Sequence, residues 1–231
     1  IHHRLVGSEM CIRDRARAIG LIGRAQMYMG DYPSALEKHL QQLKLYQQAD
    51  SILGQASALN ALGTLYDRIG EHTEALTYYL QALELCNLIN DEDRRAITLN
   101  NLALCYYQQG LFSDALEYAH ESLAIGKSRG NEYVQTWANN CLGDAYLVLE
   151  NYDEAVEHYA RNLELTSKGE NQPQRLDTLI SIGKLYNQRQ NPQQALVYLT
   201  EAESIAQSSD TKPHLYHCLL YTSPSPRDGD E

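Results

Sequence analysis

The chain repeats one pattern of small and apolar residues every forty positions. One column pairs alanine with an aliphatic residue, at Ala35-Leu36, Ala75-Leu76, Ala115-Leu116, Ala155-Val156 and Ala195-Leu196. An upstream column pairs an aliphatic residue with a small one, at Ile22-Gly23, Leu62-Gly63, Leu102-Ala103, Leu142-Gly143 and Ile182-Gly183. A third column holds Tyr66, Tyr106, Tyr146 and Tyr186, with Gln26 in the first unit. Because no insertion disturbs the register, we predict an array of similar stacked units.

Each unit has the pattern of two helices. In the second unit, apolar residues at spacings of three and four predict a first helix over residues 56–69 and a second over residues 72–89. Gly70 is expected to end the first helix, as Gly30 and Gly110 do in their units. Residues 90–93 predict a turn whose acidic side chains cap the next helix. The fold class is therefore all-α.

Small residues at fixed places indicate how the two helices of a unit pack. The glycine or alanine of the upstream column, such as Gly63, allows the second helix to approach closely. The alanine column, such as Ala75, supplies the matching space, and the tyrosine column fills the volume beside it. One unit cannot bury its apolar faces alone, so neighbouring units must stack.

The two ends of the chain differ in origin from its centre. One DNA string can encode residues 5–15, and its reverse complement, shifted by one base, encodes residues 218–227. That string resembles a sequencing-library adapter, so residues 1–15 and 218–231 are expected to be adapter or flanking sequence. The array is then expected to span residues 16–217, with units at 16–55, 56–95, 96–135, 136–175 and 176–215.

Composition narrows the possible partners and the compartment. The formal net charge of −11 disfavours nucleic acid and anionic membrane surfaces as partners, and no apolar run is long enough to cross a bilayer. Cys86, Cys105 and Cys141 lie in helical patterns without metal-type spacing. We therefore expect free buried thiols in the cytoplasm, with no metal site and no cofactor.

The second unit carries the motif of a known family. Its pattern is Leu59-x-x-Leu62-Gly63-x-x-Tyr66-x-x-x-Gly70-x-x-x-x-Ala75-x-x-x-Tyr79-x-x-Ala82. This pattern resembles the tetratricopeptide repeat (TPR). The period of forty, rather than thirty-four, is similar to that of kinesin-light-chain-like and bacterial signalling arrays. The resemblance implies a right-handed superhelical solenoid of about five antiparallel helix pairs.

The same resemblance implies a concave groove, lined by the first helix of each unit, that binds a protein or peptide. Position by position, it assigns to that groove Arg24, Asn60, Asn100, Tyr107, Trp137, Asn140, Lys184 and Asn187. Asn60, Asn100 and Asn140 occupy the same site in successive units, and their amides could hold a ligand backbone. Alternatively, they solvate the groove or bond to neighbouring helices. Trp137 could be a ligand anchor or an inter-repeat packing residue.

No enzymatic motif accompanies the repeats, so we expect no catalysis by this chain itself. The leading hypothesis is the sensory or interaction module of a larger bacterial signalling protein. Residues 210–217 resemble the joint into a further unit, which suggests a fused C-terminal effector domain beyond this fragment. Two alternatives stay open. The parent could be an enzyme, a diguanylate cyclase or histidine kinase with its catalytic domain missing here, or a stand-alone assembly scaffold.

Overall fold

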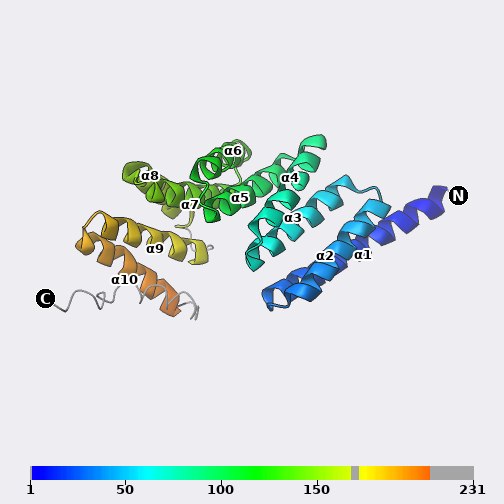
Figure 1. Cartoon of the computed structure of the whole chain (residues 1–231), viewed down its shortest axis with the longest axis horizontal. Helices are drawn as coiled ribbons and strands as arrows, with labels where there is room; N and C mark the ends of the chain where they lie inside the picture. Colours follow the sequence, from blue (N-terminus) through cyan, green and yellow to red (C-terminus); the bar gives the residue numbers. More distant parts are fainter. Residues whose placement is uncertain (1, 168–171, 209–231) are drawn as a thin grey trace. The chain divides into compact units, whose positions relative to one another are not determined.

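The computed structural model describes residues 2–167 and 172–208, and within these residues the secondary-structure elements are all α-helices (Figure 1). The helices are α1 (His2–Tyr28), α2 (Tyr32–Gln48), α3 (Ile52–Ile69), α4 (His72–Leu88), α5 (Glu92–Gln108), α6 (Phe112–Arg129), α7 (Glu132–Val148), α8 (Tyr152–Leu165), α9 (Gln172–Gln188) and α10 (Pro192–Ser208). The predicted all-α fold class is confirmed. The helices alternate with short turns, so they form antiparallel pairs.

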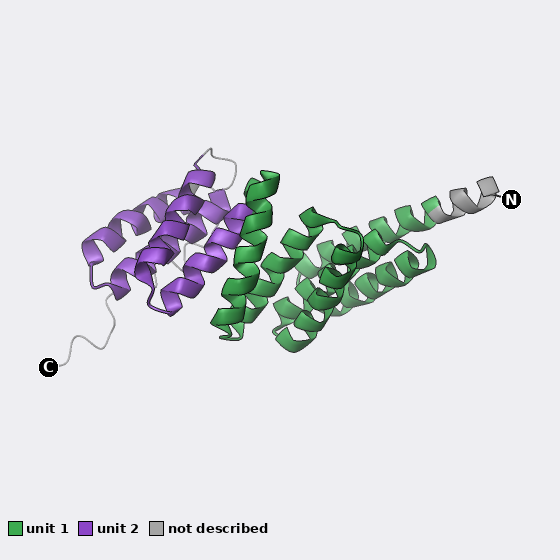
Figure 2. Ribbon diagram, turned by 90° about the horizontal axis from the view of Figure 1, so that it is seen from above, with its two compact units in different colours: residues 1–134 green, residues 135–231 purple. Residues whose placement is uncertain are grey.

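The chain divides into two compact units, residues 1–134 and residues 135–231 (Figure 2). Unit 1 contains α1 to α6 and the start of α7. Within it, α2 packs between α1 and α3, α4 packs between α3 and α5, and α6 packs on α5. Unit 2 contains the rest of α7 together with α8, α9 and α10, and α9 contacts both α8 and α10.

The ends of the chain were assigned by sequence to flanking segments. In the structure, residues 2–15 continue α1 without a break, and the Arg13 guanidinium donates a hydrogen bond to the Ala49 carbonyl at 3.3 Å. Residues 218–231 lie outside the described residues. The adapter origin of both segments stays a prediction.

Residues with a left-handed backbone conformation (positive φ) recur about every twenty positions, at the turns between helices. Gly70 has φ 87° and ends α3, as predicted, because glycine adopts this conformation without a Cβ clash. Glu150 and Gln190 take the corresponding place in later units, with φ 61° and 54°. Left-handed backbone costs an ordinary residue about 1–2 kcal/mol. The surrounding helix packing must therefore impose the turn there.

Polar side chains cap several of the helices. Asp91 Oδ1 accepts a hydrogen bond from the Arg94 backbone N–H at 3.0 Å, which confirms the acidic cap predicted before α5. Ser51 Oγ accepts from the Gly54 N–H at 3.3 Å, so α3 begins at Ile52. The expected start at residue 56 was therefore wrong, because a serine cap precedes the apolar stripe. The expected end of the second helix, at residue 89, was one residue too late.

The predicted small-residue columns lie in the core. All five column alanines, from Ala35 to Ala195, are at most 1% exposed. Each later unit also stacks two aromatic rings between its helices, because the tyrosine of the third column meets a ring twelve positions downstream. These pairs are Tyr66–Tyr78, Tyr106–Tyr118, Tyr146–His158 and Tyr186–Tyr198, with ring centroids 5.2–5.6 Å apart. Only the upstream ring of each pair belongs to the predicted tyrosine column.

Each glycine of the column faces a large side chain of the second helix at close range. A Cβ built on Gly143 would lie 2.5 Å from Tyr159 Cε1, and one on Gly63 would lie 2.6 Å from the Tyr79 ring. Both rings are buried. The third repeat places Ala103 and Ala119 at the equivalent positions, and both are fully buried. The packing therefore constrains the combined volume of the residue on the first helix and the residue that faces it on the second helix. It does not fix the size of either residue alone.

Gly143→Ala tests this size pairing. In the native chain we expect it to destabilise the protein by about 1–3 kcal/mol, because the Tyr159 ring must shift. In a Tyr159→Ala background the same change should stabilise by up to about 1 kcal/mol, since alanine forms helix better than glycine. Urea unfolding of the four proteins measures the cycle. Equal effects of Gly143→Ala in both backgrounds would contradict the pairing.

Candidate binding site

Unit 1 contains an open hollow of about 310 Å³ between its helices. It is lined by Arg24, Ala56, Ser57, Asn60, Cys86, Arg94, Ile97, Thr98 and Tyr133. The first helices α1, α3 and α5 supply most of this lining. Two of the predicted groove residues, Arg24 and Asn60, therefore share one concave surface.

Two arginines give the hollow a positive character in an acidic chain. Arg94 is held in place: its guanidinium lies 2.5 Å from Asp91 Oδ2, and its Nε donates to Ser57 Oγ at 3.2 Å. Arg24 is exposed and forms no ion pair within the described residues. Arg94 was not among the predicted groove residues, and it directly follows the turn predicted at residues 90–93.

Asn60 contributes a hydrogen-bond donor to the same hollow. Its Oδ1 accepts a hydrogen bond from Asn101 Nδ2 at 3.0 Å, which fixes the orientation of the amide. The Asn60 NH₂ group makes no hydrogen bond within the described part of the chain. It can therefore donate to a carbonyl or carboxylate oxygen.

The other predicted residues of unit 1 lie outside this lining. Asn100 is 9% exposed, and its Nδ2 donates to the Val134 carbonyl at 3.2 Å. Tyr107 packs edge-on against Phe112, with ring centroids 5.6 Å apart. Asn100 therefore ties α5 to the start of α7, which is the role in helix contacts that the sequence left open as an alternative.

In unit 2, Asn140 belongs to a buried hydrogen-bond network. Its Oδ1 lies 2.6 Å from Asn162 Nδ2 and 2.9 Å from Thr178 Oγ1, and Asn162 Nδ2 is also 2.9 Å from Thr178 Oγ1. Asn162 and Thr178 are fully buried. Asn140 thus joins side chains of α8 and α9. The three equivalent asparagines occupy three different environments.

The remaining predicted residues of unit 2 are at least partly accessible. Trp137 and Lys184 are half-buried, and Asn187 is exposed. Burial raises the pKa of the nearby Asp144 carboxyl, although a 2.6 Å hydrogen bond from Tyr159 and the charge of Lys184 act in the opposite direction. These residues can contact a partner, but no lining residue of the unit 1 hollow lies on unit 2.

The described cysteines are free, as predicted, and three of them are buried. Burial raises the pKa of Cys105 and of Cys141 to about 12, and it also raises the pKa of Cys86. These thiols are therefore protonated at neutral pH and unsuited to nucleophilic catalysis. The helices in the described ranges are either too short or too polar to cross a membrane.

Comparison with known proteins supports the helical-repeat interpretation. The tetratricopeptide repeat profile matches residues 14–87, 54–128 and 133–208. No curated protein sequence gives a match. The solved structure of a putative kinesin light chain with nearly identical TPR-like repeats, from P. anserina, is similar with a TM-score of 0.66. It shares 18% sequence identity, and the match covers 86% of this chain and 98% of that one.

Two further structures are similar in fold. NprR in complex with its cognate peptide NprX has a TM-score of 0.73 and 14% identity, over 93% of this chain and 63% of the NprR chain. A STAND protein with a tetratricopeptide repeat sensor, from Pyrococcus horikoshii, has a TM-score of 0.74 and 18% identity, over 91% of this chain and 33% of its own. Identities this low show a shared fold only. The repeat profile, however, spans most of the sequence, and the chain belongs to the tetratricopeptide repeat family.

Proposed function

We propose that this chain is a peptide- or protein-binding module, and that the hollow of unit 1 receives a carboxylate-bearing segment of an extended partner. The observation that carries the proposal is the meeting of Arg24, Arg94 and the free amide N–H groups of Asn60 in one open hollow. Guanidinium groups bind carboxylates through charge-assisted hydrogen bonds, and the amide can donate to the partner's backbone.

The charge of the whole chain favours recognition at this one place. A net charge of −11 repels acidic partners from most of the surface, so the arginines of the hollow give such a partner one favourable docking position. Arg94 is already oriented by Asp91 and Ser57, which lowers the entropy lost on binding.

The similar structures fit a role in sensing. NprR was solved with a cognate peptide, and the STAND protein uses its tetratricopeptide repeats as a sensor within a longer chain. By analogy, we propose that this array is a cytoplasmic sensory or interaction module that regulates a fused effector domain. The predicted groove residues of unit 2, Trp137, Asn140, Lys184 and Asn187, belong to the same proposal as a separate contact surface for the partner.

Removing the charge of the hollow tests the proposal directly. Peptides selected for binding to the whole chain from a random displayed library should be rich in Asp and Glu. Arg24→Gln/Arg94→Gln should weaken their binding by about tenfold or more, which fluorescence anisotropy measures. Arg161→Gln removes one exposed charge from unit 2 and should leave the affinity unchanged. Equal affinity for the double variant, or failure to select any peptide, would contradict a carboxylate site here.

Substitution of Asn60 is expected to affect mainly peptide binding, whereas substitution of Asn140 is expected to affect mainly stability. Asn60→Ala should weaken a selected peptide about two- to tenfold and cost little stability, because only the contact with Asn101 is lost. Asn140→Ala should instead cost about 1–3 kcal/mol of stability, because it removes a hydrogen-bond acceptor from both the buried Asn162 amide and the buried Thr178 hydroxyl. Anisotropy and urea unfolding of both variants give the comparison. Equal losses of stability would show that the two amides have the same structural role.

A further inference from the structure

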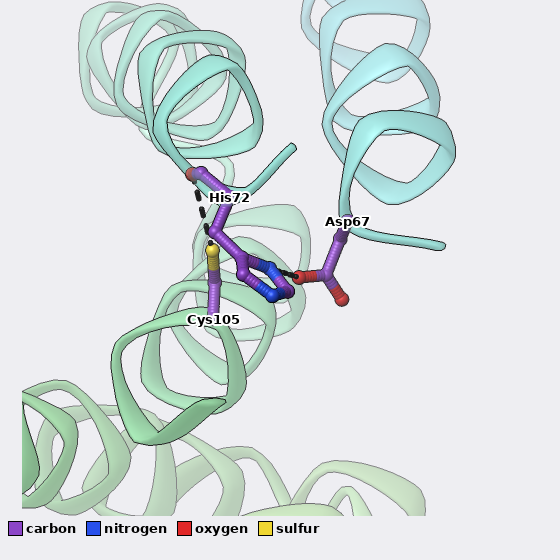
Figure 3. Close-up of side chains that lie close together, drawn as sticks. All are labelled: Asp67, His72 and Cys105. Carbon is purple, nitrogen blue, oxygen red and sulfur yellow. Dashed lines mark hydrogen bonds and ion pairs between the residues drawn. The ribbon is translucent and has the colours of Figure 1, made fainter. Parts of the chain in front are cut away.

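Three metal-ligating side chains meet in unit 1 where α3, α4 and α5 come together (Figure 3). Asp67 lies in the last turn of α3, His72 is the first residue of α4, and Cys105 lies in α5. One donor atom from each residue lies within 4.8 Å of the other two. Asp67 and His72 are close in sequence, but Cys105 lies on another helix, and only the fold brings its thiol to the other two side chains.

The contacts within the cluster orient all three groups. The His72 Nδ1–H donates to Asp67 Oδ1 at 2.9 Å, because an ionised carboxylate can only accept. The Cys105 thiol donates to the His72 backbone carbonyl at 3.5 Å, not to the imidazole (Figure 3). The Cys105 side chain is fully buried, whereas the Asp67 and His72 side chains are 13% and 28% exposed. The cluster is therefore open to solvent on one side.

The equivalent places in two other repeats form hydrophobic clusters. Forty positions upstream, Met27, Tyr32 and Leu65 pack together in one hydrophobic cluster. Eighty positions downstream, Leu147, Tyr152 and Leu185 do the same. Stacking of the repeats therefore requires only apolar contact here. In this one repeat, all three positions have changed to residues that bind metal ions.

We infer that Asp67, His72 and Cys105 form a Zn²⁺ site. Thiolate, imidazole and carboxylate are the ligands that zinc takes in proteins. At zinc bond lengths, tetrahedral ligand atoms lie about 3.3–3.6 Å apart, so small side-chain rotations would close the cluster around an ion. On binding, the Nδ1 proton of a neutral His72 would move to Nε2, so that Nδ1 could bind the ion, and the Cys105 thiol would release its proton to solvent.

The surroundings meet two further requirements of a metal site. Gln109 Nε2 lies 3.7 Å from Cys105 Sγ and can donate to a thiolate, as outer-shell groups do around zinc ligands. The exposed edges of Asp67 and His72 leave a path for the ion and a fourth position for water. The alternative is that the cluster is a hydrogen-bonded brace for the α3–α4 turn, without a metal.

Binding of Co²⁺ in place of Zn²⁺ distinguishes a metal site from a hydrogen-bonded brace. The whole chain, with Cys11→Ser and Cys218→Ser to remove other thiols, is titrated with Co²⁺ under reducing conditions. One equivalent should produce a thiolate-to-cobalt charge-transfer band and the visible absorption of tetrahedral cobalt, and Zn²⁺ should abolish both. Zn²⁺ should also raise the melting temperature, and EDTA should reverse that rise. Absence of the bands would overturn the site in favour of the brace.

The other repeats supply matched variants. Cys105→Leu and His72→Tyr install the residues found at Leu185 and Tyr152, so the helices should form normally by circular dichroism. Each should lose the cobalt bands, and Asp67→Asn should weaken Zn²⁺ at least about tenfold. Cys141→Ala is the control, because it removes a buried thiol from unit 2 and should leave the bands intact. Bands that survive Cys105→Leu, or full affinity in Asp67→Asn, would overturn the three-ligand site.

Discussion

The close approach of the two helices in each repeat is the contact on which the rest of the structure depends. It is possible because Gly63 and Gly143 leave room for the buried rings of Tyr79 and Tyr159, and because the third repeat pairs two alanines instead. Once the helices approach at this point, the ring stacks such as Tyr106–Tyr118 can form beside it. The left-handed turns at Glu150 and Gln190 are then imposed despite their backbone cost. The complementary sizes of the small-residue column and the facing column on the second helix thus set the helix packing, and the backbone of the turn residues conforms to it.

Much of the fold could be predicted from one sequence because the repeats act as their own alignment. The columns of Gly63 and Ala75 locate the helix pairs, and the structure has helices at these places in every repeat. Helix ends were less predictable, since they depend on single side chains. Ser51 caps α3, so the helix begins at Ile52, four residues before the predicted start, and hydrophobic spacing alone does not reveal that cap. The partner ring of each aromatic stack, such as Tyr78, was visible as a second column but was not used.

The candidate site was less predictable than the fold, because helical position gives the face of a residue but not its neighbours. Asn60, Asn100 and Asn140 share one position, yet the first accepts from the Asn101 amide, the second donates to a backbone carbonyl and the third joins a buried network. What differs is the facing residue on the next helix, and that residue changes from repeat to repeat. Equivalent asparagines therefore need not form a ladder along the groove.

Positions at which one repeat differs from the others indicate a functional site better than positions that the repeats share. Where one repeat buries Met27, Tyr32 and Leu65, the next places Asp67, His72 and Cys105, although apolar side chains satisfy the same junction elsewhere. Exchanging three packing residues for polar ones gives up hydrophobic burial and requires hydrogen bonds to offset it. The hydrogen bonds of the cluster can offset part of that loss, and a ligand that binds only the folded junction, as we propose for Zn²⁺, would offset more of it. A repeat protein in this way separates the residues that hold it together from those available for function, and the difference can be read within a single chain.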